Sequence, residues 1–174
     1  MSESVHKHRE SAPENVRIAV LTISDTRTPE TDTGGDAIQE IMEGAGHEVV
    51  ERAIVRDEAS QIRTGLVDLL ARSDVDAIVT TGGTGISARD TTYEVVDRML
   101  EKKLDGFGEI FRMLSYEEIG AAAILSRALA GSVGAKFVVC LPGSRNGVRL
   151  AVEKLLVPEI SHVVFELRKH QEGR

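Results

Sequence analysis

The sequence predicts a three-layer α/β fold, an open and mostly parallel sheet with helices on both faces, and two observations carry this prediction. Short apolar runs alternate along the chain with segments whose apolar residues recur every three or four positions, the spacing of an amphipathic helix. The first run, 16–23, becomes continuously apolar, which is typical of a parallel strand covered on both faces. With 174 residues the chain can bury a substantial core as one domain. We expect that domain over 16–170, after a disordered polar tail over 1–15.

Strands are predicted where apolar runs are bounded by turn residues. A further run, 128–133, is short and fits either an edge strand or half of a hairpin. The four clear strands are 16–23, 48–55, 76–81 and 136–141.

Helices are predicted between these strands from the periodicity of their apolar residues. Glycines are expected to interrupt one of them, and Pro158 is expected to break the chain before the last one. The predicted helices are 36–45, a helix capped by Ser60 that carries Ile62 to Leu70, 91–103, 104–124 with interruptions at Gly106, Gly108 and Gly120, 146–157, and 159–169.

Three loops leave strands at their carboxyl ends, namely 24–35, 82–90 and 142–146, and Asp57 follows the strand 48–55. Ligands of open parallel sheets bind beyond the carboxyl ends of the strands. We therefore expect these loops and Asp57 to meet at one edge of the sheet and to form the functional site there.

The loop after the strand 76–81 is rich in glycine, and it is a candidate phosphate cradle. Glycine lets backbone N–H groups approach an anion closely, and the helix that follows adds free N–H donors at its N-terminus. A Walker loop is excluded because the loop lacks the Lys-Ser/Thr pair. Gly83 to Ala88 formally match a Rossmann fingerprint, but no strand follows the next helix. The structural alternative is a turn in which Asp90 caps that helix, with a capping box from Thr91 to Glu94.

Four carboxylates fall on the loops of the same edge, Asp25, Asp32, Asp57 and Asp90. Each alone fits a turn or a cap, because aspartate favours both. Together, beside a phosphate-binding loop, they suit Mg²⁺, which binds one or two carboxylates together with substrate phosphates.

Composition argues against several classes of protein. Aromatic residues make up 3% of the chain and the net charge is −7, which does not favour a nucleic-acid binder. No apolar run approaches the about 20 residues that span a bilayer. The single cysteine, Cys140, suits the reducing cytoplasm, and no histidine or cysteine cluster has the spacing of a zinc site. We expect a cytoplasmic protein that binds neither membrane nor nucleic acid.

The chain also resembles a known family through several motifs in the same order, over roughly 16–165. They are Val20-Leu-Thr-Ile-Ser-Asp-Thr-Arg27 with Asp32-Thr-Gly-Gly35, Thr81-Gly-Gly-Thr-Gly85 with Arg89-Asp90-Thr91-Thr92, the segment Gly106 to Ala128, and Leu141-Pro-Gly-Ser-Arg-Asn-Gly-Val148. Together they are similar to molybdenum cofactor biosynthesis proteins of the MogA/MoaB type, which the gephyrin G domain also represents.

The resemblance implies an enzyme, a nucleotidyltransferase that adenylylates molybdopterin with Mg²⁺ and ATP and releases pyrophosphate. It implies homotrimers or homohexamers, and contact with other enzymes of the molybdenum cofactor pathway. By position it implies nucleotide binding by Thr81, Gly82, Gly83, Thr84 and Gly85, catalytic and metal-binding roles for Asp57 and Asp90, and pterin binding by Ser24, Asp25, Asp32, Gly143 and Ser144.

Two positions depart from the family's pattern. Tyr93 stands where the family often has proline, and Arg145 follows Ser144 where many catalytic members have proline. The alternative function is a non-catalytic oligomer that binds molybdopterin or a nucleotide as a carrier or scaffold in the same pathway. A role in later metal insertion is a third option.

Overall fold

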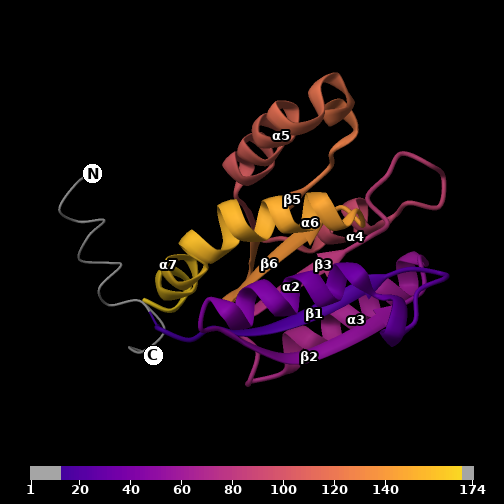
Figure 1. The fold of residues 1–174 in the computed structure, drawn as a ribbon. Coiled ribbons are helices and arrows are strands. Elements are labelled where there is room, and N and C mark those ends of the chain that lie inside the picture. Colours follow the sequence, from indigo (N-terminus) through magenta and orange to yellow (C-terminus); the bar gives the residue numbers. More distant parts are fainter. Residues whose placement is uncertain (1–12, 170–174) are drawn as a thin grey trace.

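The computed structural model describes residues 13–169, and most of the tail expected over 1–15 lies outside that range. One six-stranded sheet forms the middle layer, in the order β2-β1-β3-β6-β5-β4 (Figure 1). The strands are β1 (Arg17–Ile23), β2 (Glu48–Val55), β3 (Ala77–Thr81), β4 (Lys102–Lys103), β5 (Leu129–Val133) and β6 (Lys136–Leu141).

The sheet is mixed but mostly parallel, as predicted. β1 pairs in parallel with β2 and β3, and β3 pairs in parallel with β6. The run that the sequence left ambiguous is β5, which forms a hairpin with β6 and is antiparallel to it. β5 is not the edge, because the two residues of β4 pair with Gly131 and Ser132 beyond it.

Helices cover both faces of the sheet, which gives the three expected layers (Figure 1). None of the helices within 13–169 is long and apolar enough to cross a membrane. The helical elements are η1 (Pro29–Thr31), α2 (Thr33–Gly44), α3 (Ala59–Ala71), α4 (Thr92–Met99), α5 (Asp105–Ile119), η2 (Gly120–Leu125), α6 (Arg145–Ala151), η3 (Val152–Leu156) and α7 (Val157–Arg168).

Two apolar cores lie on the two faces, and alternate strand residues feed them. Ile18 and Val20 of β1 pack with α2, α5, α6 and α7, whereas Ala19 and Leu21 pack with α3 and α4. The period of two in a strand sends successive side chains to opposite faces, so a strand buried on both faces reads as a continuous apolar run. This explains why the pattern of 16–23 predicted the layers correctly.

Two predicted helices differ from the structure, one in its end and one in its continuity. The helix expected over 91–103 ends at Met99, because the chain turns there to pair β4 with β5. Gly106 and Gly108 lie inside an uninterrupted α5. Gly108 suits a close approach rather than a break, since a Cβ there would lie 2.7 Å from the carbonyl oxygen of Ala128.

Pro158 does not break the chain, as the sequence suggested, but lies in the first turn of α7. The helix that begins with α6 passes through a single π-helical stretch, η3, and continues as α7. The N–H of Val157 donates to the carbonyl of Val152, five residues back. This wider turn accommodates a residue that lacks an N–H and whose ring would clash with the preceding turn.

Two predicted helix starts are also wrong. α3 begins at Ala59, so Ser60 lies inside the first turn and does not cap it. α2 begins at Thr33, because the buried Asp32 is its N-cap and accepts a hydrogen bond from the N–H of Gly35 at 3.0 Å.

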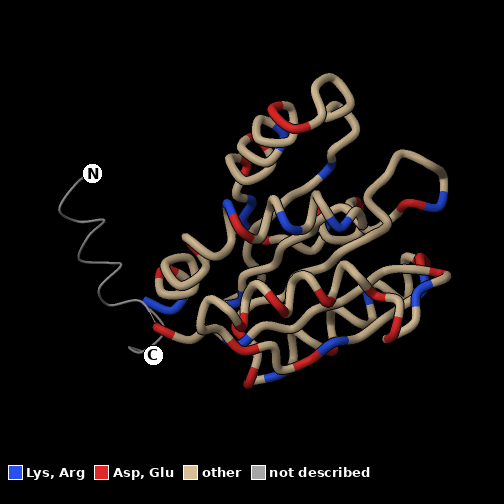
Figure 2. Tube along the Cα trace, viewed as in Figure 1, with Lys and Arg blue, Asp and Glu red and all other residues tan. Residues whose placement is uncertain are grey.

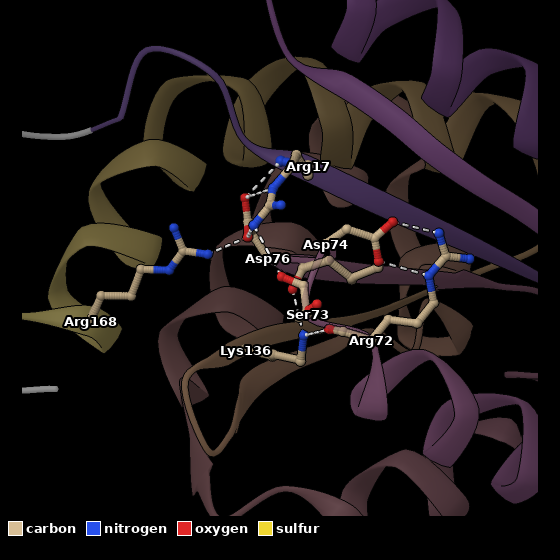
Figure 3. A network of polar contacts seen from close by, with 8 residues as sticks. Arg17, Arg72, Ser73, Asp74, Asp76, Lys136 and Arg168 are labelled. Atoms are coloured by element: carbon tan, nitrogen blue, oxygen red, sulfur yellow. Dashed lines mark hydrogen bonds and ion pairs between the residues drawn. The ribbon is translucent and has the colours of Figure 1, made fainter. Parts of the chain in front are cut away.

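At the amino ends of the parallel strands, one buried carboxylate ties the C-terminal helix to the sheet (Figure 3). Asp76, 3% exposed, accepts three hydrogen bonds from Arg17, the shortest at 2.7 Å, and pairs with Arg168 of α7. Burial by itself would raise the pKa of Asp76, but the hydrogen bonds and charges of both arginines outweigh it and hold the pKa below its usual value.

We expect Asp76→Asn to destabilise the protein by roughly 2–3 kcal/mol at pH 7, less than a fully buried pair because both arginines are partly exposed. The lowered pKa makes the contribution of Asp76 complete above the usual pKa of an aspartate, and it is lost as the pH falls through the lowered value. Urea unfolding between pH 2 and 7 should therefore show a flatter acid limb in the variant. An equally steep acid limb would contradict this role.

Candidate functional site

A cleft of about 210 Å³ lies where the carboxyl ends of β1, β3 and β6 meet. The chain leaves β1 toward α2 on one face of the sheet and leaves β3 toward α4 on the other face, so the carboxyl ends of β1 and β3 form a topological switch point. Such a switch point is where open α/β sheets bind ligands. The cleft is lined by Thr22, Ile23, Ser24, Arg27, Asp32, Gly34, Thr81, Gly82, Gly83 and Gly143.

Gly82 lies where three strand ends come closest. Its φ is +100°, and a Cβ would lie 2.2 Å from the carbonyl oxygen of Ile23. Its N–H donates to the carbonyl of Leu141 at 3.2 Å, and a Cβ on Gly143 would lie 3.2 Å from the Cα of Gly82. Only glycine fits this conformation and this spacing.

Gly83 lies beside the carboxylate of Asp57. Its φ is +63°, and a Cβ would lie 2.2 Å from Oγ1 of Thr92 and 2.8 Å from Oδ2 of Asp57. The structure thus brings Asp57 of the loop after β2 against the glycine loop after β3, as the sequence predicted for this edge.

The environment of Asp57 disfavours its ionised form. Its Oδ1 is buried and accepts no hydrogen bond from any described residue. The buried hydroxyls of Thr91 and Thr92 likewise have no hydrogen-bond partner among the described residues. Burial raises the pKa of Asp57; a hydrogen bond from the backbone N–H of Thr91 opposes this rise, whereas the charges of Asp90 and Asp25 add to it. A carboxylate held in this way gains from a cation.

Asp90 serves the glycine loop and not the helix that follows it. The backbone N–H of Ser87 donates to its carboxylate at 2.9 Å, and Gly85 also donates from the backbone. Hydrogen bonds from Ser87 and Gly85 lower the pKa of Asp90 and overcome a weaker effect of burial, with a small contribution from the charge of Arg127. At a given pH, Asp90 is therefore more readily ionised than Asp57.

The predicted caps of α4 are wrong. Thr91 is the N-cap residue, but its side chain makes no capping hydrogen bond. Glu94, the expected partner in the capping box, instead pairs with Arg127, 33 positions along the chain.

The residues expected on the pterin side divide into two groups. Ser24, Asp32 and Gly143 line the cleft. The oxygens of Asp32 are engaged by the N–H of Gly35, by Thr22 at 2.8 Å and by Arg52 at 3.1 Å, so Asp32 shapes the wall and leaves little capacity for a ligand.

Asp25 and Ser144 lie outside this wall. Asp25 accepts from the backbone N–H of Asp57 at 3.3 Å and from Arg89 at 2.7 Å, so it belongs with the Asp57 side of the site. Ser144 is the N-cap of α6, and its hydroxyl accepts from the N–H of Gly147 at 3.3 Å.

Sequence reasoning missed two cationic side chains of the site. Arg27 lines the cleft and is held by the carbonyl of Thr31. Arg127 reaches the glycine loop from the segment between η2 and β5, with its guanidinium 4.2 Å above the ring of Tyr93. The sequence did indicate that Arg127 could be functional, because Arg127 stands in one of the motifs that carry the family resemblance.

The donor set fits Mg²⁺ better than a metal that needs a complete protein cage. Within 13–169 no three His, Cys, Asp or Glu side chains are placed to hold a metal ion together. Asp57 and Asp90 supply carboxylate oxygens beside the loop, and Mg²⁺ takes its other ligands from water and substrate phosphates. Acidic and basic residues are interspersed along the chain, and the loop between β3 and α4 carries one of each, Arg89 and Asp90 (Figure 2).

Comparison with known proteins identifies the family of this chain. The family described as a probable molybdopterin binding domain matches residues 19–162. The molybdenum cofactor biosynthesis protein B of Halalkalibacterium halodurans is 52% identical over 167 residues, which cover 95% of this chain and 98% of the relative.

Solved structures show the same fold. A crystal structure of molybdenum cofactor biosynthesis protein B has a TM-score of 0.89 and 48% identity, covering 91% of this chain and 99% of its own. The tungsten cofactor synthesizing protein MoaB of Pyrococcus furiosus has a TM-score of 0.80 and 36% identity, covering 90% and 99%. The chain belongs to the MoaB family of molybdenum cofactor biosynthesis proteins.

Proposed function

We propose that this chain is a nucleotidyltransferase that adenylylates molybdopterin in a Mg²⁺-dependent reaction with ATP. An oxygen of the terminal phosphate of the pterin attacks the α-phosphorus of ATP. The bond from that phosphorus to the bridging oxygen of the β-phosphate breaks, and pyrophosphate leaves with the electron pair. The products are adenylyl-molybdopterin and pyrophosphate.

One observation carries the proposal: the buried Oδ1 of Asp57, beside Gly83 at the switch point, has no hydrogen-bond partner among residues 13–169. A buried carboxylate oxygen without a hydrogen bond is costly unless a ligand satisfies it. A pure anion binder has no use for further negative charge at its phosphate loop. A carboxylate there is useful if it holds a cation between itself and the phosphates.

Different residues of the site would hold the phosphates, the metal and the pterin. The loop Thr81 to Gly85 would hold the phosphates. The backbone N–H groups of Gly83 and Thr84 are the candidate donors, because those of Gly82 and Gly85 already donate to Leu141 and Asp90. Asp57 and Asp90 would hold Mg²⁺. When bound, Mg²⁺ neutralises charge on the phosphates and polarises the phosphorus. Ser24 and Gly143 line the neighbouring wall, where the pterin phosphate would be received, with Ser144, Asp25 and Asp32 shaping the loops around it.

We expect Asp57→Asn to lower the rate of Mg²⁺- and ATP-dependent pyrophosphate release by at least about 100-fold, because the metal loses its anionic ligand. The raised pKa means that ionised Asp57 opposes folding, an effect that grows as the pH rises through that pKa. The same variant should therefore be more stable than the parent without ligand at pH 7.

Pyrophosphate release with molybdopterin and thermal unfolding without ligand measure the two effects. Asp68→Asn, on the exposed side of α3, is the matched control and should change neither. Parent-like turnover in Asp57→Asn would refute the catalytic proposal. If calorimetry shows that the parent protein binds ATP and molybdopterin tightly but never turns over, the carrier or scaffold function is favoured instead.

Gly83→Ala tests the phosphate loop. Its Cβ would press on Thr92 and Asp57 at a positive φ, so we expect a loss of about 1–2 kcal/mol in stability and at least tenfold weaker binding of Mg²⁺ and an unhydrolysable ATP analogue. Gly44→Ala is the matched control. Gly44 is exposed in the last turn of α2 with nothing within 4 Å of its Cβ position, and alanine there should add about 0.5–1 kcal/mol. Unchanged nucleotide affinity in Gly83→Ala would place the nucleotide elsewhere.

We also propose that the chain acts in the cytoplasm as a homotrimer or homohexamer, and that it meets other enzymes of the pathway there. The free, buried thiol of Cys140 suits a reducing compartment. α5 and η2 project beside β5 and α6 (Figure 1). They expose six large apolar side chains, more than a monomer usually leaves in one place: Ile110, Met113, Tyr116, Ile119, Ile124 and Leu125.

If this surface joins subunits, Met113→Glu with Ile119→Glu should reduce the mass in solution to the 18.9 kDa of one chain, because buried charge opposes an apolar interface. Light scattering after size exclusion measures the mass, and we expect three or six chain masses for the parent. Val67→Glu, at an exposed apolar position of α3, is the control and should leave the parent mass unchanged. An intact oligomer in the double variant would exclude this surface.

A further inference from the structure

The side chain of Arg127 contacts both the glycine loop, at Gly85, and helix α4, at Tyr93 and Glu94, although the site as proposed assigns it no role. Arg127 lies between η2 and β5 and its side chain is only 24% exposed. We infer that Arg127 is a positioning residue, which holds the Gly85 peptide and, through it, the carboxylate of Asp90. The inference deepens the proposed function and rests on it for the catalytic consequence alone.

Arg127 contacts the glycine loop directly. Nη1 of Arg127 donates to the carbonyl of Gly85 at 2.9 Å. The backbone N–H of Gly85 donates in turn to Asp90, and a Cβ on Gly85 would lie 2.6 Å from Oδ2 of Asp90. One glycine is thus held on both sides, by a cation at its carbonyl and by a carboxylate at its N–H.

Arg127 is itself held in place by two residues of α4. Its Nη2 pairs with Glu94 of α4, and its guanidinium lies 4.2 Å above the centroid of Tyr93. Arginine suits this place because its planar group can donate two hydrogen bonds in fixed directions while it stacks on a ring. An ammonium group cannot reproduce that combination.

The position of Asp90 in the loop depends on the contact of Arg127 with Gly85. Residues Ile86 to Arg89 are exposed, so the loop beyond Gly85 has little packing of its own. Asp90 keeps its place through the N–H groups of Gly85 and Ser87. Loss of Arg127 frees the Gly85 carbonyl and therefore loosens the donors that orient Asp90.

Arg127→Met tests the inference, because methionine keeps most of the length and removes both hydrogen bonds. We expect amide hydrogen exchange at Gly85 and Ser87 in the ligand-free protein to become at least tenfold faster. We expect kcat for adenylylation to fall by at least tenfold with little change in KM for molybdopterin. Arg127→Lys should lie between parent and Arg127→Met in both measurements, and Tyr93→Leu should show a smaller acceleration of exchange at the same two amides.

Arg149→Met is the matched control, because Arg149 makes surface ion pairs with Glu40 and Glu153 on the α2 and α6 side. It should leave exchange at Gly85 and Ser87 as in the parent. Exchange that accelerates only around 126–129 in Arg127→Met would show that Arg127 merely anchors its own segment, and it would overturn the inference. Should the parent fail to adenylylate molybdopterin, the proposed function fails, and the exchange result still decides the role of Arg127. If Arg127→Met does not fold, the exchange rates of Arg127→Lys and Tyr93→Leu decide it, and parent-like rates in both would refute it.

Discussion

The close approach of three strand ends at Gly82 is the constraint on which the site depends. β1, β3 and β6 stop where the backbone of Gly82 meets the carbonyl of Ile23, the carbonyl of Leu141 and the Cα of Gly143. Thr81 reinforces the contact, since its hydroxyl donates to the carbonyl of Pro142 at 2.9 Å. Without side chains at these glycines, the loops after the three strands converge on one small cleft, and every functional group is placed relative to that convergence.

Two carboxylates beside the same loop have opposite electrostatic character. One buried oxygen of Asp57 accepts no hydrogen bond from the part of the chain that the structure describes, and burial raises the pKa of Asp57. Asp90 receives N–H donors from the loop and has a lowered pKa. Environments that push two pKa values apart are common at functional sites, because each group can then keep a different role at one pH. The folded chain therefore carries a local energetic cost at Asp57, which a bound ligand would relieve.

Patterns of apolar residues predicted the layers and the strands well, because burial on one face or on two leaves a regular trace in the sequence. They also placed Asp57 and the glycine loop at one edge. They failed where the deciding contact is distant. Glu94 looked like a capping residue, yet its partner is Arg127, and the helix expected up to 103 stops at Met99 because β4 pairs with β5. The prediction that Pro158 breaks the chain was wrong for another reason, since a π-helical turn has no distinct signature in the local sequence.

The brevity of β4 has a consequence for how copies of this chain can meet. An unpaired strand edge invites another chain to extend the sheet, and proteins often protect such edges with short strands and lysine. β4 is two residues long, and both are exposed lysines. The opposite edge, β2, carries Glu51 and Arg52, which are tied into ion pairs with Arg72 and with Asp32 and Asp36. Both edges of the sheet therefore disfavour strand addition and fibre growth.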